Sequence, residues 1–221
     1  MERVIVVADR GLNTSDNTAF LSGKNHDDMV GNDGYVYGQS VLGADKQFKE
    51  WVLNQEDYVI NKEIDKDGNT FFFKHKSRVY AKKIQLKGRG GRRAQKMEIY
   101  QKQMVYYSEK YARKQKKDRD KAIAKAKELI SNPGKYTRAT SFGAAGYVRN
   151  IKFSKETGEI PDGLVLSLNE ARIQEEEKYD GYYSIVTSEK HLSDTEIRDI
   201  YKGLWEIEES FKIIKSEFKA R

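Results

Sequence analysis

The segment from Ser193 to Arg221 predicts one long amphipathic helix, and such a helix requires a core against which its apolar face can pack. Ser193 followed by Glu196 is a capping box, which marks the start of the helix. An apolar stripe then recurs at steps of three and four residues: Ile200, Leu204, Ile207, Phe211, Ile214 and Phe218. We expect this stripe to be buried.

The neighbouring stripe of the same helix places a carboxylate beside the apolar stripe. This carboxylate is Glu208, with Tyr201 two turns before it and Lys215 two turns after it. A carboxylate on a rigid, half-buried helix is a suitable metal ligand. Phenol and ammonium groups beside it are suitable phosphate ligands. An amphipathic helix with mixed surface charges would explain the same spacing.

The composition limits the class of protein. Hydrophobic residues make up 38% of the 221 residues, with 14 Tyr and 9 Phe, so a core can form. The chain has no cysteine, which excludes disulfides and cysteine-based zinc sites and favours a cytoplasmic location. No apolar run approaches the roughly 18 residues that a membrane span needs, so no membrane association is expected.

Positive charge is concentrated in the middle of the chain. Residues 74–121 hold 18 Lys and Arg against 4 Asp and Glu, a net charge of +14, whereas the other residues hold 23 against 30. A block this basic favours a polyanion as partner, and double-stranded DNA is the leading candidate. A lysine-rich helix exposed to solvent is the alternative.

Hydrophobic patterning predicts an α/β fold that is interrupted by a β-rich stretch. Strands are expected over residues 3–8, 34–40, 58–62, 70–74, 78–84, 96–108 and 182–187, with two more short strands within 147–168. Helices are expected over residues 13–21, 46–53, 109–131, 170–178 and 193–221. The predicted domains are a first core part over 1–54, a basic insertion over 55–177, and a closing strand and helix over 178–221.

Asp9 stands at the carboxyl end of the apolar run 3–8, the position at which α/β sheets place their ligands. Glu208 is its natural partner, because two carboxylates from a strand end and a helix can bind Mg²⁺ through oxygen. Many strands, however, end in Asp-x-Gly simply to turn the chain or to cap the next helix. A site with two metal ions usually needs a third carboxylate, and no other acid in the chain has an obviously equivalent position.

These residues resemble the DDE transposases of bacterial insertion sequences. The resemblance rests on Asp9-Arg10, on the run 183–189, and on the helix segment from Ile200 to Lys215. Within this family, the residues most resemble the cut-and-paste group, which has the signature Y-x2-R-x3-E-x6-K. Tyr201, Glu208 and Lys215 match that signature, whereas its arginine position is occupied by Leu204.

The resemblance implies an RNase H-like mixed sheet, incomplete here, that is interrupted by the basic insertion. It implies Mg²⁺-dependent cleavage at transposon ends and strand transfer, with Mn²⁺ as a possible substitute. Asp9 and Glu208 would be the catalytic metal ligands. A homodimer in the complete family protein is also implied.

The resemblance further assigns DNA-binding roles. Tyr201, Lys215 and Lys212 would hold backbone phosphates, and Tyr183 would stack on a flipped base, unless its ring is an ordinary core aromatic. The basic residues expected to bind DNA without base readout are Arg89, Arg92, Arg93, Lys114, Lys116 and Lys117.

The family's first aspartate has no counterpart in this sequence. We therefore expect an internal fragment of a transposase with little or no activity. A DNA-binding fragment without catalysis is the alternative function.

Overall fold

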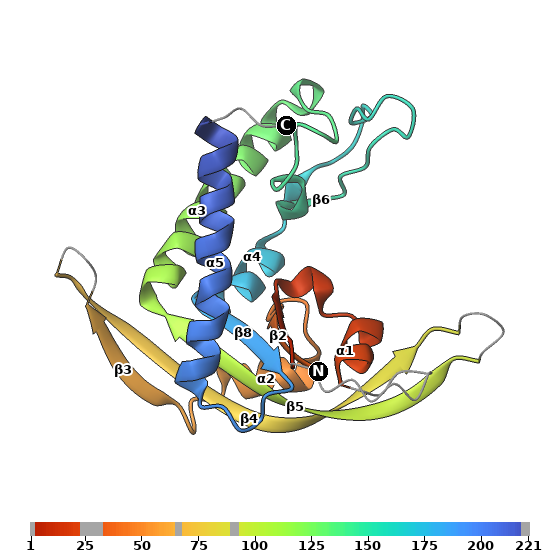
Figure 1. Ribbon diagram of the computed structural model, residues 1–221. Helices are drawn as coiled ribbons and strands as arrows, with labels where there is room; N and C mark the ends of the chain where they lie inside the picture. The colour runs from red at the N-terminus through yellow and green to blue at the C-terminus, as the bar shows by residue number, and fades with distance from the viewer. Residues whose placement is uncertain (1–2, 23–32, 65–67, 89–92, 218–221) are drawn as a thin grey trace. The chain divides into compact units, whose positions relative to one another are not determined.

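The computed structural model describes residues 3–22, 33–64, 68–88 and 93–217, except for the side chains of Glu63, Trp205 and residues 207–217. The described residues form a mixed α/β structure with a six-stranded sheet, a two-stranded sheet and five α-helices (Figure 1). The α/β class predicted from the sequence is therefore confirmed.

The elements follow the chain in this order. The strands are β1 (Ile5–Ala8), β2 (Gly34–Gln39), β3 (Val59–Ile64), β4 (Thr70–Leu86), β5 (Gln95–Ser108), β6 (Val148–Arg149), β7 (Ser167–Leu168) and β8 (Tyr182–Thr187). The α-helices are α1 (Ser15–Leu21), α2 (Lys46–Leu53), α3 (Glu109–Ser131), α4 (Glu170–Glu177) and α5 (Asp194–Glu217). Short 3₁₀ turns lie at Arg10–Leu12 (η1), Pro133–Lys135 (η2) and Ala145–Tyr147 (η3).

The large sheet has the strand order β1-β2-β8-β5-β4-β3. β1 and β2 are parallel, with Ile5 opposite Gly34, whereas β2 and β8 are antiparallel, with Val36 opposite Thr187. β2 and β8 are almost entirely buried, as expected for strands that lie inside a sheet. Strands from the two ends of the chain thus share one sheet with the long strands of the basic region.

The chain forms two compact units. The first comprises residues 1–61, 74–106 and 183–221, and the second comprises residues 62–73 and 107–182. Residues 74–106 belong to the first unit because β4 and β5 continue the sheet from β8. The predicted insertion, 55–177, thus contributes residues to both units.

Local sequence explains the helix starts. Asp45 caps α2 by accepting a hydrogen bond from the Phe48 backbone N–H at 2.8 Å. Ser193 and Glu196 form the predicted capping box of α5. The Ser193 N–H donates to the Glu196 carboxylate at 2.8 Å, and the Glu196 N–H donates to the Ser193 hydroxyl at 3.2 Å.

The second unit is built on α3. Its buried core lies between α3, the segment that follows it, and α4: Ala126, Leu129, Ala144, Tyr147, Val148, Ile160 and Ile173. Arg119 on α3 is 7% exposed and donates two hydrogen bonds to Asp180, at 2.5 and 2.6 Å. This bidentate pair is charge-assisted and ties α3 to the loop before β8.

Two details of the prediction were wrong. The strands expected over 70–74 and 78–84 are one continuous strand, β4, which lies next to β5 in the sheet. The predicted stripe of α5 omitted Ile197, which is fully buried, whereas Ile200 and Leu204 are only half-buried. The later members of that stripe lie outside the described side chains.

Among the described residues, no helix combines the length and apolar character that crossing a bilayer requires.

Candidate functional site

Asp9 follows β1 at its carboxyl end, and its side chain is exposed. It is the N-cap of η1, where one carboxylate oxygen, Oδ1, accepts a hydrogen bond from the Gly11 N–H at 2.8 Å. The capping role that the sequence offered as an alternative is thus present. The cap places one donor on Oδ1. The other lone pairs of the Asp9 carboxylate remain available and face solvent at this strand end.

Tyr201 lies on α5, which packs on β1 and β2. The side chain is 9% exposed. A β-carbon on Gly38 in β2 would stand 2.5 Å from the Tyr201 hydroxyl and 3.2 Å from the backbone nitrogen of Arg10. The phenol predicted to hold phosphate therefore lies deep against the sheet, at the strand end that carries Asp9.

Three residues predicted on α5 continue the same helix. Glu208, Lys212 and Lys215 fall within its backbone range, and their side chains lie outside the described residues. Glu208 is seven residues beyond Tyr201, which corresponds to two helical turns. The helix that carries Glu208 is therefore anchored at the carboxyl ends of β1 and β2.

Tyr183 lies in β8 and is half-buried. Its ring stacks on that of Tyr106, with centroids 5.1 Å apart and 13° between the planes. Tyr106 in turn stacks on His75 at 5.9 Å. One face of Tyr183 is thus covered by another aromatic ring.

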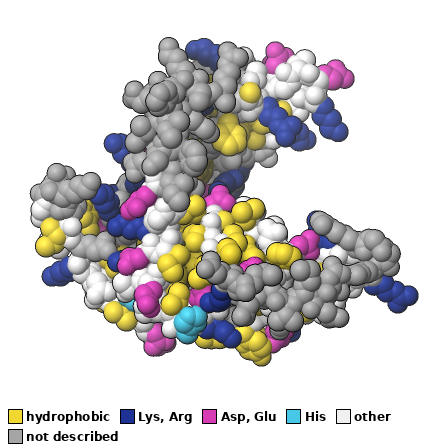
Figure 2. Space-filling view, viewed as in Figure 1, with side chains coloured by type: hydrophobic (Ala, Val, Ile, Leu, Met, Phe, Trp, Pro, Cys, Tyr) yellow, Lys and Arg dark blue, Asp and Glu magenta, His cyan; other side chains and the backbone are white. Residues whose placement is uncertain are grey.

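The cations predicted to contact DNA have different positions. Lys114, Lys116 and Lys117 are exposed on α3, and Arg93 is exposed just before β5. Arg89 and Arg92 lie outside the described residues. Figure 2 shows Lys and Arg side chains at the surface of the described residues.

Sequence reasoning missed a row of polar residues on one face of β4. Lys74, Lys76, Arg78, Tyr80 and Lys82 alternate at a period of two, which is the signal that would have found them. Lys74 and Lys76 are 9% and 4% exposed.

The two lysines at the start of this row are held by the segment after α2. Lys74 donates to the Gln55 side chain, and Lys76 donates to the Asn54 carbonyl at 2.7 Å. Both ammonium groups also lie 4.5 Å from the centre of the Tyr58 ring. These two lysines therefore have a structural role.

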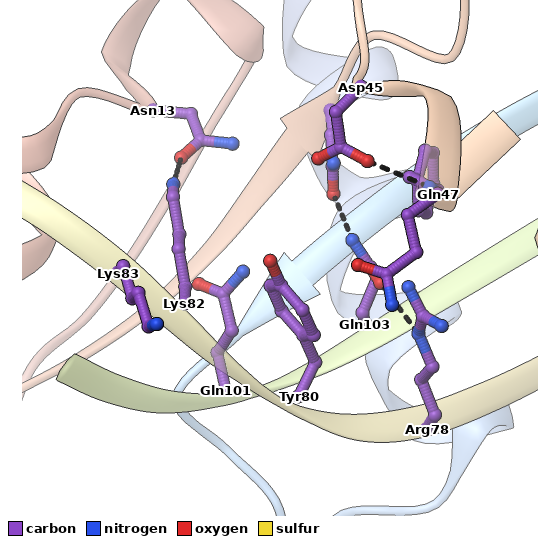
Figure 3. Close-up of a pocket in the computed structure, with 11 residues that line it drawn as sticks. Asn13, Asp45, Gln47, Arg78, Tyr80, Lys82, Lys83, Gln101 and Gln103 are labelled. Atoms are coloured by element: carbon purple, nitrogen blue, oxygen red, sulfur yellow. Dashed lines mark hydrogen bonds between the residues drawn. The ribbon is translucent and has the colours of Figure 1, made fainter.

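The other end of the row lines a cavity of about 190 Å³ between β4, β5 and α2, which we call the Arg78 pocket (Figure 3). Its three cations are Arg78, Lys82 and Lys83, and Asp45 is its one carboxylate. Five carboxamides complete its polar lining: Asn13, Gln39, Gln47, Gln101 and Gln103.

Hydrogen bonds between the lining residues fix the pocket. Gln103 is 2% exposed, accepts from Arg78 Nε at 2.9 Å and donates to Gln39 at 3.1 Å. Lys82 donates to the Asn13 side chain at 3.3 Å. Burial lowers the pKa of both Arg78 and Lys82.

Asp194 in the first turn of α5 joins the helix to β4 and β5. Its carboxylate accepts from Lys102 at 2.7 Å and from Ser77 at 2.9 Å, and it lies 3.1 Å from the His75 ring nitrogen. Burial alone would raise its pKa, but the donors, with Lys102 first, hold the pKa below its usual range. Sequence reasoning did not identify this cluster, since its members are far apart along the chain.

Glu189 follows β8 and is fully buried. Oε1 pairs with Arg3 at 2.5 Å, and Oε2 lies 3.8 Å from His191. A β-carbon on Gly34 would stand 2.2 Å from Oε1. Gly34 is the first residue of β2, so the Glu189 carboxylate lies at the opposite end of the parallel strands from Asp9. Glu189 and Asp9 therefore cannot bind the same ligand.

Among the described residues, no group of three or more His, Cys, Asp or Glu side chains is placed so that it could hold a metal ion. Asp9 offers oxygen ligands of the type that Mg²⁺ prefers. The second predicted ligand, Glu208, lies in the part of α5 whose side chains are outside the description.

Comparison with known proteins identifies no relative. No protein-family model matches the chain, and neither does any curated protein sequence or any solved structure.

Proposed function

We propose that this chain binds double-stranded DNA and forms part of a metal-dependent DNA-cleaving site of the DDE transposase type. Asp9 and Glu208 would be its metal-binding carboxylates, and Mg²⁺ would activate the attacking oxygen and stabilise charge on the leaving oxygen. The fold would be RNase H-like with a basic insertion. The protein would act in the cytoplasm on nucleoid DNA, and the family resemblance implies a homodimer.

One observation carries the proposal. Tyr201 packs against Gly38 beside the Arg10 backbone, so α5 is anchored at the strand end that bears Asp9. Glu208 lies two turns further along the same rigid helix. On this proposal, Tyr201, Glu208 and Lys215 are carried by one helix that packs on the strand preceding Asp9.

DNA as the partner is supported by charge. Exposed lysines on α3 and Arg93 belong to the region with a net charge of +14. Contacts of this kind bind phosphates without reading bases, and the affinity falls as salt rises.

The second candidate is a DNA-binding chain without catalysis. It is favoured by the cap that Asp9 forms with Gly11, which gives this carboxylate a structural role. On either proposal we expect the isolated 221-residue chain not to cleave transposon ends, because two carboxylates rarely hold both metal ions.

Iron-directed cleavage of the protein tests the metal site. Fe²⁺ replaces Mg²⁺, ascorbate and peroxide generate hydroxyl radicals at the bound ion, and mass spectrometry locates the cuts in the chain. We expect cuts near residues 9 and 208 that excess Mg²⁺ suppresses and that are lost in both Asp9→Asn and Glu208→Gln. Asp199→Asn, an exposed acid on α5, is the matched control.

Cuts elsewhere, or cuts that persist in both variants, would leave the DNA-binding chain without catalysis as the better proposal. Nicking of a supercoiled plasmid with Mn²⁺ provides the second readout. Nicking by the wild-type chain that is lost in both variants would show that the isolated chain is more active than we expect.

A further inference from the structure

We propose that the Arg78 pocket is a binding site for one phosphate-type oxyanion, held by the Arg78 guanidinium and the Lys82 ammonium. The pocket is separate from the carboxylates assigned above. Its lining carries three cations and one acid, so it has a positive balance.

Arg78 is oriented to bind an oxyanion through its two terminal nitrogens. Nε donates to the buried Gln103, and the guanidinium lies 4.2 Å from the centre of the Trp51 ring and 5.3 Å from that of Tyr80. These contacts fix the plane of the group. Guanidinium nitrogens held in this manner match the geometry of phosphate oxygens.

Lys82 adds a second, partly desolvated cation. Its ammonium group donates to the side-chain oxygen of Asn13, a neutral acceptor, at 3.3 Å, and it forms no ion pair with a carboxylate among the described residues. A cation withdrawn from water without a counter-charge is unfavourable, and an anion in the pocket would compensate for that.

The one acid of the pocket offsets only part of the charge of its three cations. Asp45 is exposed and caps α2 through the Phe48 N–H. The carboxamide groups add neutral donors. The side-chain oxygen of Gln101 accepts a hydrogen bond from the Tyr35 hydroxyl, so its NH₂ group can donate to a ligand.

The cavity volume limits the ligand. About 190 Å³ is smaller than the roughly 300–1,000 Å³ of sites for drug-sized ligands. A single phosphate group fits this limit better than a whole nucleotide does.

The pocket adjoins the strand end that carries Asp9. Asn13, which accepts from Lys82, also donates to the Gly38 carbonyl at 3.3 Å, and Gly38 is the residue beside Arg10 and Tyr201. A phosphate of a DNA strand that passes Asp9 is therefore the source we favour. That choice of source rests on the proposed function, whereas the pocket itself does not.

Titration with inorganic phosphate tests the pocket. The full chain is followed by ¹H–¹⁵N NMR while phosphate replaces chloride at constant ionic strength. We expect saturating shifts in residues 78–83 and in the side-chain amide of Gln101. Shifts that do not saturate, or saturating shifts only elsewhere in the chain, would overturn the proposal without any variant being needed.

Variants then assign the cations. Arg78→Gln and Lys82→Gln should each weaken phosphate binding about tenfold or more, since each removes hydrogen bonds to a charged ligand. Lys190→Gln, an exposed lysine after β8, should leave the affinity unchanged. Arg78→Lys keeps the charge and should still lose affinity. Wild-type affinity in both glutamine variants would overturn the proposal.

Competition distinguishes the two sources of phosphate. If a short DNA duplex displaces inorganic phosphate and Arg78→Gln weakens duplex binding, the ligand is a backbone phosphate. If phosphate binds and the duplex does not displace it, the pocket is confirmed as a site for free phosphate. Asp9→Asn should leave phosphate binding intact, because Asp9 does not line the pocket. The phosphate site can therefore be confirmed even if the proposed metal site is wrong.

Discussion

The hydroxyl of Tyr201 fills the space above Gly38 that a β-carbon would need. The distance from that oxygen to an ideal β-carbon on Gly38 is 2.5 Å, whereas the ring carbon Cζ lies at 3.5 Å. The glycine near the end of buried strand β2 is therefore explained by close approach of a helix, rather than by an unusual backbone conformation.

Gly38→Ala should destabilise the first unit by roughly 1–3 kcal/mol, because the new methyl group overpacks the contact. Tyr201→Phe removes the hydroxyl and should relieve most of this overpacking, since the next atom of the ring, Cζ, lies at ordinary contact distance from the new methyl group. In urea unfolding, Gly38→Ala/Tyr201→Phe should thus be more stable than the sum of the two single variants predicts. Additive effects would show that α5 does not pack on β2 in this manner.

Asp194→Asn should destabilise the first unit by about 2 kcal/mol, because charge-assisted hydrogen bonds from Lys102 and Ser77 are weakened. Asp199→Asn, at an exposed position of the same helix, should change stability by less than about 0.5 kcal/mol.

The effect of Asp194 should depend on pH. A carboxyl group whose pKa is lowered in the folded state contributes stability above its unfolded pKa, which is about 3.9 for Asp. That contribution is lost as the pH falls through the folded pKa. The difference between wild type and Asp194→Asn should therefore be present at pH 7 and shrink below about pH 4, where Asp194 becomes protonated. A difference that does not shrink in this acidic range would contradict the network.

Local signals predicted most elements of the fold. The bounds of α2, α3 and β8 agree with the prediction, because caps and periodicity are encoded nearby in the sequence. The continuity of β4 was missed, because the polar residues between its two predicted halves suggested a break. The burial of Lys76 depends on the segment after α2, and His75 and Ser77 contact Asp194 of α5, which no local pattern specifies.

The candidate site could be predicted only in part. Asp9 at a strand end and the helix range that contains Glu208 follow from motifs, whereas the packing of α5 on β1 and β2 is seen only in the structure. The Arg78 pocket is different. It combines residues from β2, β4, β5 and α2, and only tertiary structure brings these together.

Asp180→Asn should destabilise the second unit by about 3 kcal/mol, since it leaves the guanidinium of Arg119 buried without its main counter-charge. Glu177, at 3.5 Å, is half-exposed and compensates only partly. Lys116→Gln on the same helix has an exposed partner and should have almost no effect. Equal stability of Asp180→Asn and Lys116→Gln in chemical unfolding would contradict this role for Arg119.

Replacement of Lys114, Lys116 and Lys117 by Gln should weaken duplex DNA binding and make it less sensitive to salt. Each lost phosphate contact should reduce the slope of log affinity against log salt by roughly 0.9. The control triple replaces exposed lysines of the same unit by Gln, at Lys135, Lys152 and Lys155, and so changes the net charge equally. If binding depends only on total charge, fluorescence anisotropy should give the same slope for both triples. A smaller slope for the α3 triple alone would instead assign the contact to that face of the helix.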